Sequence, residues 1–211
     1  SPGRFIPIAE QTGLILPLGA WVLEAGCRLL GEWQHDPRLS RLKLSLNVSV
    51  RQFQQPTFVE QVMSTLTSTG APPERLTLEL TESLLMSDPE GTIDKMLRLR
   101  QLGIRFALDD FGTGYSSLAY LKSLPLNTLK IDFAFVRDLT LDMQATPIAA
   151  TIIALAESLG LDVVAEGVEE ENQFGILKES ECEIAQGYYF YEPMTPDAFM
   201  TLITESRNSS T

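Results

Sequence analysis

Histidine and cysteine are nearly absent from this sequence, and their scarcity removes several kinds of active site. Among 211 residues there are one histidine and two cysteines. His35 lies in the turn-like segment His35-Asp36-Pro37, where a solvent-facing loop residue is expected. A histidine-based zinc centre is therefore excluded, and catalysis by a serine–histidine–aspartate triad is disfavoured.

The two cysteines, Cys27 and Cys182, are expected to be reduced and buried, as in a cytosolic protein. The sequence shows no signal peptide and no apolar run long enough to span a bilayer. A cytoplasmic location follows as an expectation, and a membrane anchor elsewhere in a longer parent protein is left open.

Positive charge is also scarce, since 16 basic residues face 28 acidic ones and the formal net charge is -12. This balance argues against binding to a nucleic-acid polymer or to an anionic membrane surface. It does not exclude a nucleotide substrate, because bound metal ions can reverse the local field. A hydrophobic content of 44% is enough for a full core. With no break in composition, residues 1–211 are expected to form a single domain.

Strand-like and helix-like segments alternate along the chain, which predicts a parallel sheet covered by helices. Strands are predicted at 43–48, 76–80, 104–108, 128–131, 162–165 and 183–185. Helices are predicted at 18–33, 58–66, 92–102, 116–121, 147–159 and 170–178, with another starting at 195–197. In the third helix Thr92 is the expected cap, and Ile93, Met96 and Leu97 are expected to face inward. Trp21 and Trp33 are expected in the core.

Each predicted strand carries a polar residue at or near its carboxyl end. These residues are Asn47, Glu79, Asp109, Lys130, Glu166 and Gln186. Any one of them alone is more simply a cap, a surface residue or a structural group. Six at equivalent positions favour a TIM-like (β/α)8 barrel, in which the carboxyl ends of all strands converge on one catalytic face.

The segment from Ile104 to Leu118 holds the densest group of such residues, because two carboxylates, Asp109 and Asp110, follow one another there. One aspartate could be only a turn or capping residue, but adjacent carboxylates repel unless a proton or cation lies between them. Glu79 and Glu166 would add two more, with Lys130 as the single offset. Oxygen ligands without histidine or cysteine favour Mg²⁺, Mn²⁺ or Ca²⁺ over zinc.

An acidic pair can bridge two metals about 3.5–4 Å apart, an arrangement used for in-line displacement at phosphorus. Lys130 would then orient or help to deprotonate a metal-bound water, or neutralise charge on the phosphoryl oxygens.

At these positions the chain resembles the EAL domain family, bacterial cyclic-di-GMP phosphodiesterases with a barrel fold. The resemblance covers nearly the whole chain and rests on motifs that occur in order. They are Phe5-Ile6-Pro7-Ile8-Ala9-Glu10, Leu46-Asn47-Val48-Ser49, Glu79-Leu80-Thr81-Glu82, Asp109-Asp110-Phe111-Gly112-Thr113-Gly114-Tyr115-Ser116-Ser117-Leu118, Leu129-Lys130-Ile131-Asp132, Ala165-Glu166-Gly167-Val168-Glu169 and Gln186-Gly187-Tyr188.

The resemblance implies hydrolysis of cyclic di-GMP to linear pGpG at a two-metal site holding Mg²⁺ or Mn²⁺, with Ca²⁺ as a candidate inhibitor. It implies roles for each strand-end residue. The metal ligands would be Asn47, Glu79 and Asp109, with Asp110 at the second metal. Lys130 would contact the nucleophilic water, Glu166 would be the catalytic glutamate near the second metal, and Gln186 would support the site.

The resemblance further implies that Glu82 anchors the loop at residues 111–120, which couples dimerisation to activity in this family. A homodimer through that loop is therefore expected. Because family members usually end multidomain signalling proteins, fusion to upstream signalling domains is expected as well.

One departure from the family pattern bears on activity. In the family, the naming Glu-Ala-Leu motif precedes the segment at which this sequence starts, and so does a nearby phosphate-binding arginine. The glutamate of that motif is a metal ligand. Two strands of the barrel are expected to be missing with them, so that the barrel is incomplete and the fragment is impaired.

Three alternative functions stay open from the residues. A catalytically silent cyclic-di-GMP receptor would keep the binding site without cutting the nucleotide. A phosphoacceptor domain would use the acidic pair and Lys130 but leave Asn47, Glu79 and Glu166 unexplained. An enolase-like barrel has similar electrostatics but does not predict the glycine-spaced loop after Asp110.

Overall fold

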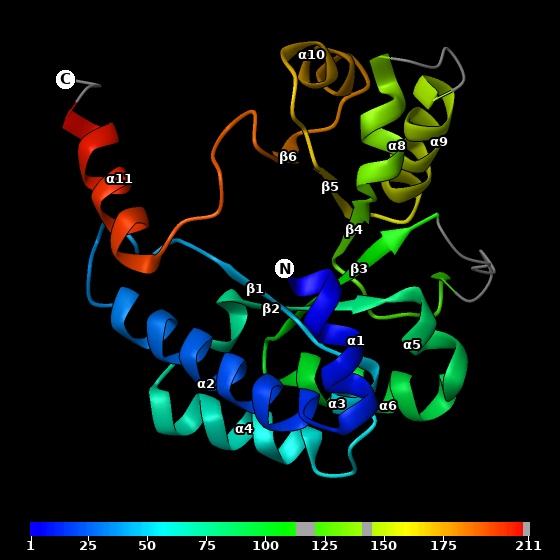
Figure 1. Cartoon of the computed structure of the whole chain (residues 1–211). Coiled ribbons are helices and arrows are strands. Elements are labelled where there is room, and N and C mark those ends of the chain that lie inside the picture. The colour runs from blue at the N-terminus through cyan, green and yellow to red at the C-terminus, as the bar shows by residue number, and fades with distance from the viewer. Residues whose placement is uncertain (113–120, 141–144, 209–211) are drawn as a thin grey trace.

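A parallel sheet of six strands forms the centre of the structure, a computed structural model that describes residues 1–112, 121–140 and 145–208 (Figure 1). The strands are β1 (Leu44–Asn47), β2 (Leu76–Thr81), β3 (Arg105–Phe111), β4 (Thr128–Ile131), β5 (Asp162–Glu166) and β6 (Ile184–Gln186). They follow one another across the sheet in chain order, and every neighbouring pair is parallel. This is the singly wound order of a barrel, curled here into an open half-barrel.

Alternation along the strands explains why one face of the sheet is apolar and the other polar. Leu78 in β2, Leu108 in β3 and Leu129 in β4 are completely buried on the side that the helices cover. Thr77 and Glu79, which alternate with Leu78, face the concave side of the half-barrel. The concave face is thereby free to carry functional groups.

Helices surround this sheet on its outer side. They are α1 (Pro2–Thr12), α2 (Ile15–Trp33), α3 (Val50–Phe53), α4 (Phe58–Thr69), α5 (Glu82–Ser87), α6 (Pro89–Gln101), α8 (Phe133–Arg137), α9 (Ala145–Ser158), α10 (Glu171–Glu179) and α11 (Pro196–Asn208), with 3-10 turns at Pro73–Arg75 and Asp138–Thr140. In Figure 1, α2 and α4 run side by side below the first strands, while α8, α9 and α10 gather beside the last ones.

The last helix crosses back to the beginning of the chain, as the red segment in Figure 1 shows. The ring of Phe199 in α11 lies 5.9 Å from that of Trp33 at the end of α2. Arg38 donates to the hydroxyl of Thr204 over 3.3 Å. These contacts hold α11 against the end of α2 and the turn that follows it.

The predicted strands are all confirmed, with ends shifted by a few residues at most. The helices predicted at 18–33, 58–66, 147–159 and 170–178 correspond to α2, α4, α9 and α10, and the one starting at 195–197 corresponds to α11. The helix predicted at 116–121 lies almost wholly outside the described residues. Four short or proline-containing helices, α1, α3, α5 and α8, were not predicted.

The start predicted for the third helix is wrong. α6 begins at Pro89, and its cap is Asp88, whose carboxylate accepts a hydrogen bond from the Gly91 amide over 3.1 Å. Proline at the first helical position costs no hydrogen bond, so the helix extends three residues further upstream than Thr92. Of the residues predicted to face inward, Met96 is buried and Ile93 packs against the core, whereas Leu97 is 46% exposed.

Trp21 is a second correction, because it is 64% exposed whereas Trp33 is buried as predicted. Cys27 and Cys182 are free and buried, which confirms the expectation for both. His35 is exposed in a turn, also as expected. Within the described residues no single helix is long and apolar enough to cross a bilayer, although α1 and α2, bent by 120°, meet the length and composition test as a pair.

Gly187, which follows β6 directly, offers a test of this packing. A Cβ atom there would overlap the backbone oxygen and nitrogen of Val168, which cannot move without disturbing β5. Gly187→Ala is expected to lower the free energy of unfolding by about 1–3 kcal/mol in urea denaturation. Gly175→Ala is the matched control: the exposed α10 position has open space, and alanine there should stabilise by up to about 1 kcal/mol. Equal effects would contradict the packing at Gly187.

Candidate active site

One lysine side chain holds three carboxylates together on the concave face of the half-barrel. The ammonium nitrogen of Lys130 lies 2.6 Å from Glu79, 3.0 Å from Asp109 and 2.6 Å from Glu166. Lys130 is 5% exposed and Glu79 8% exposed, so the contacts are shielded from water. The structure therefore brings together four of the predicted site residues, from β2, β3, β4 and β5.

Strand register explains how residues far apart in the sequence meet here. Asn47 in β1 is the direct partner of Glu79 in β2, and Thr81 in β2 is the partner of Asp109 in β3. Glu166 in β5 pairs with Gln186 in β6. Because parallel strands end on the same side of a sheet, each strand contributes its last polar residue to one face.

The charges of this cluster do not cancel. Burial by itself lowers the pKa of Lys130, but Glu79 and Glu166 outweigh burial and raise the pKa above its ordinary value. Burial is also the main cause that raises the pKa of Glu166, while its hydrogen bond with Lys130 acts in the opposite direction. Lys130 is thus held in its protonated form, and the cluster retains an excess of negative charge.

Asp110 occupies a special backbone position beside the cluster. Its φ of 55° lies in the left-handed region, which residues with a side chain seldom adopt. Its amide donates to the carboxylate of Asp109 over 3.1 Å. Burial raises the pKa of Asp110, and the nearby carboxylates of Asp109 and Asp132 raise it further. The raised pKa of Asp110 agrees with the repulsion expected between adjacent carboxylates.

Asp132 is a residue of the site that the sequence reasoning missed. It caps α8 by accepting from the Ala134 amide over 2.7 Å, and its carboxylate also faces Asp110. The sequence did carry a signal for Asp132, because this residue directly follows β4 and lies two residues after Lys130. Its place in the motif Leu129-Lys130-Ile131-Asp132 was noted, but no role was assigned to it.

Glu82 lies at the start of α5, outside the Lys130 cluster. One carboxylate oxygen accepts from the Gly112 amide over 3.2 Å, and the other is buried and accepts no hydrogen bond from any residue that the structure describes. This contact ties α5 to the residue that follows β3. The loop proposed to depend on Glu82 continues through residues 113–120, which lie outside the described residues.

Two hollows adjoin the cluster. A cleft of about 810 Å³ runs between α1, α2 and the ends of β1 to β3, and Asn47, Asp109 and Asp110 line it together with Arg51 of α3. A cavity of about 300 Å³ lies on the concave face, lined by Glu79, Lys130 and Gln186 among others. Asn47 and Gln186, both exposed, are thus placed next to the cluster from opposite edges of the sheet.

The donor groups at this site are of the kind that bind hard divalent cations. Asn47, Glu79 and Asp109 offer amide and carboxylate oxygens from three adjacent strands, which suit Mg²⁺ or Mn²⁺. In the described part of the chain, no three carboxylate, histidine or cysteine side chains already stand at metal-binding spacing. The Lys130 ammonium instead supplies the positive charge between Glu79 and Asp109. The residues fit a metal by their chemistry.

Comparison with known proteins identifies the family to which this geometry belongs. The sequence model of the EAL domain matches residues 1–193. The chain belongs to the EAL domain family. Membership of this family rules out two of the alternatives, a phosphoacceptor domain and an enolase-like barrel.

Relatives in this family share sequence over nearly the whole chain. The cyclic di-GMP phosphodiesterase NbdA of Pseudomonas aeruginosa is 43% identical over 92% of this chain and 24% of its own length. The signaling protein YkoW of Bacillus subtilis is 40% identical over 97% of this chain and 25% of its own length. The chain therefore spans about a quarter of the curated relatives that it matches.

Solved structures agree with the half-barrel. The phosphodiesterase MucR of Pseudomonas aeruginosa, solved as a c-di-GMP complex, superposes with a TM-score of 0.91 at 39% identity, covering 94% of this chain and 80% of that one. The EAL domain of Mycobacterium smegmatis DcpA gives 0.84 at 39% identity, over 89% of this chain and 84% of that one. The fold is therefore the TIM-like EAL fold.

Lys130→Met tests whether the lysine holds the site together. Removing one partner of a buried ion pair leaves uncompensated charge, so the variant is expected to lose about 3–5 kcal/mol of unfolding free energy in divalent-free urea titrations. Arg98→Met is the matched control, because its ion pair with Glu60 is exposed on both sides and screened by water. A loss at Lys130 no larger than at Arg98 would show that the cluster is not held by this ammonium.

Proposed function

We propose that this domain hydrolyses cyclic di-GMP to linear pGpG, with Mg²⁺ or Mn²⁺ bound by Asn47, Glu79, Asp109 and Asp110. The observation that carries the proposal is the convergence of Glu79, Asp109 and Glu166 on Lys130 at the carboxyl ends of the strands. Relatives named as cyclic di-GMP phosphodiesterases, at about 40% identity, support the choice of substrate.

Hydrolysis of the phosphodiester requires water oxygen to bond to phosphorus while the ribose oxygen leaves with a proton. A bound divalent ion would supply Lewis-acid stabilisation of the phosphoryl oxygens and lower the pKa of water. Glu79 and Glu166 raise the pKa of Lys130, which supports a role for its ammonium in orienting the water or offsetting charge on the phosphoryl oxygens.

Glu166 is the candidate for holding a proton. Burial raises its pKa, so its carboxyl can take a proton closer to neutral pH than an exposed acid. Arg51 is a cation in the acidic cleft that can meet a substrate phosphate. Gln186 can donate its amide across the concave cavity beside Lys130.

The remaining biology of the domain is proposed from its family and composition. We infer a homodimer through the loop at 111–120, with Glu82 linking that loop to the site. We further infer upstream signalling domains in a longer parent, a cytoplasmic location and no nucleic-acid polymer as partner. The relatives' greater length supports the inference of upstream signalling domains, since the chain covers 24–33% of NbdA, MucR and PA2567 of Pseudomonas aeruginosa.

A phosphodiesterase assay tests the proposed activity. With Mg²⁺ or Mn²⁺ the chain, or the same chain extended upstream, is expected to form pGpG; a chelator should abolish the product and Ca²⁺ should fail to support it. Asp109→Asn keeps the shape of the side chain and is expected to reduce turnover about 100-fold or more. Asp94→Asn, on the exposed face of α6, is the matched control and should keep full activity.

A second experiment distinguishes an enzyme from a receptor. Calorimetry with cyclic di-GMP, followed by chromatography of the bound nucleotide, shows whether the ligand is cut. Intact nucleotide recovered after long incubation with Mg²⁺, from both the short and the extended chain, would establish a silent receptor instead. Equal rates for the two chains would refute the idea that the upstream segment matters.

A further inference from the structure

A separate cavity, here called the basal cavity, lies at the opposite end of the strands from the Lys130 cluster. It measures about 600 Å³ and is lined by Arg100, Arg105, Lys122, Asn127 and Asp162 among others. Arg105 and Asp162 are the first residues of β3 and β5, while the catalytic candidates stand near strand ends. Both residues also line the concave cavity beside Lys130, so the basal cavity opens at the far end of the same strands.

Rigid elements hold the cations of the basal cavity in place. Arg100 belongs to the last turn of α6, and Lys122 lies in the connection between β3 and β4. Three buried leucines of that connection, Leu121, Leu124 and Leu126, form the floor between them. The cations are exposed above an apolar base, which leaves their charged ends accessible.

The cavity carries a positive surplus in a strongly acidic chain. Arg105 donates to Asp162 over 2.7 Å, so this pair largely cancels and leaves Arg100 and Lys122. No ion pair found within the described ranges involves Arg100 or Lys122. The carboxyl ends of α6 and α9 point toward this end of the sheet, and each contributes roughly half a negative charge. When these two helix-end charges are subtracted from the charges of Arg100 and Lys122, about one positive unit remains.

Asn127 adds a neutral donor to the same wall. Its side-chain oxygen accepts from the Phe106 amide over 3.0 Å, which turns the amide nitrogen away from that contact. Its backbone bonds to Phe106 and Asp162, both at 2.9 Å, fix its position between β3 and β5. The wall thus combines a fixed amide donor with guanidinium and ammonium donors, a set that matches anionic oxygens.

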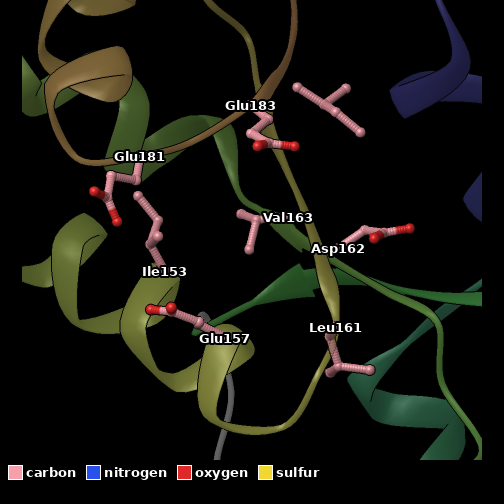
Figure 2. Close-up of a pocket in the computed structure, with 8 residues that line it drawn as sticks. Ile153, Glu157, Leu161, Asp162, Val163, Glu181 and Glu183 are labelled. Atoms are coloured by element: carbon pink, nitrogen blue, oxygen red, sulfur yellow. The ribbon is translucent and has the colours of Figure 1, made fainter.

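The hollow next to the basal cavity has the opposite charge, and Figure 2 shows it. Glu157, Glu181 and Glu183 surround it, while Asp162 and Val163 point to opposite sides of β5. A carboxylate cluster alone does not make a site. It does show that the basic residues are concentrated on one side of Asp162 and are not spread over this end of the molecule.

We propose that the basal cavity binds the phosphate monoester of a small molecule, of about the size of a nucleoside monophosphate. Such a group carries close to two negative charges near neutral pH and offers only acceptors. Arginine presents paired donors to phosphate, and a volume of about 600 Å³ is in the range of small-molecule sites. The inference does not depend on the reaction proposed above.

Calorimetry of the full chain with GMP, and separately with inorganic phosphate, tests the proposal at low ionic strength in chelator-containing buffer. The variant Arg100→Gln/Lys122→Gln is expected to weaken GMP binding at least 10-fold. Arg98→Gln, on the same helix but outside the cavity, should bind like the wild type.

Several results would overturn the proposal. They are no saturable heat with either anion, or unchanged affinity in the double variant. Tighter binding of an oligoglutamate peptide than of GMP would replace it with an acidic polypeptide partner. If the double variant does not fold by circular dichroism, Lys122→Gln alone, at an exposed turn position, supplies the same comparison.

Discussion

The buried ammonium of Lys130 is the interaction on which the arrangement of this site depends. It lies within 3.0 Å of carboxylates from three other strands, and water is largely excluded from these contacts. Without a cation, those carboxylates would repel one another at the low dielectric of the interior. The lysine therefore makes it possible to gather acidic oxygens at one end of the sheet, where a divalent ion can compete for them.

The sheet supplies the geometry for that gathering. The apolar outward residues of β2, β3 and β4 are anchored under the helices, so the alternating inward residues are fixed in register. Asn47 faces Glu79 across one strand pair, and Gln186 faces Glu166 across another. The site spans the whole width of the half-barrel because each strand contributes one polar residue at its carboxyl end.

A basic cavity lies at the opposite end of the strands from the carboxylate cluster, next to an acidic hollow. Carboxylates dominate at the end with Asp109 and Asp110, while Arg100 and Lys122 stand at the other end. In a chain of net charge -12 such separation keeps an anionic group away from the acidic cluster unless a cation accompanies it. Divalent ions and free phosphate groups would thus be recognised at different places on one small fold.

The sequence by itself determined the order of the strands, the fold class and the polar residue at each strand end, because period-two alternation and strand-end position are local properties. It did not determine that α6 starts at Pro89, because Asp88 and Pro89 are equally typical of a loop. It also did not determine that Trp21 is exposed, because this depends on whether another element covers that face of α2. Only the tertiary structure decided which strand-end residues touch. Lys130 meets Glu79, Asp109 and Glu166, while Glu82 turns to the Gly112 amide, because contacts across parallel strands are set by register and twist and not by spacing along the chain.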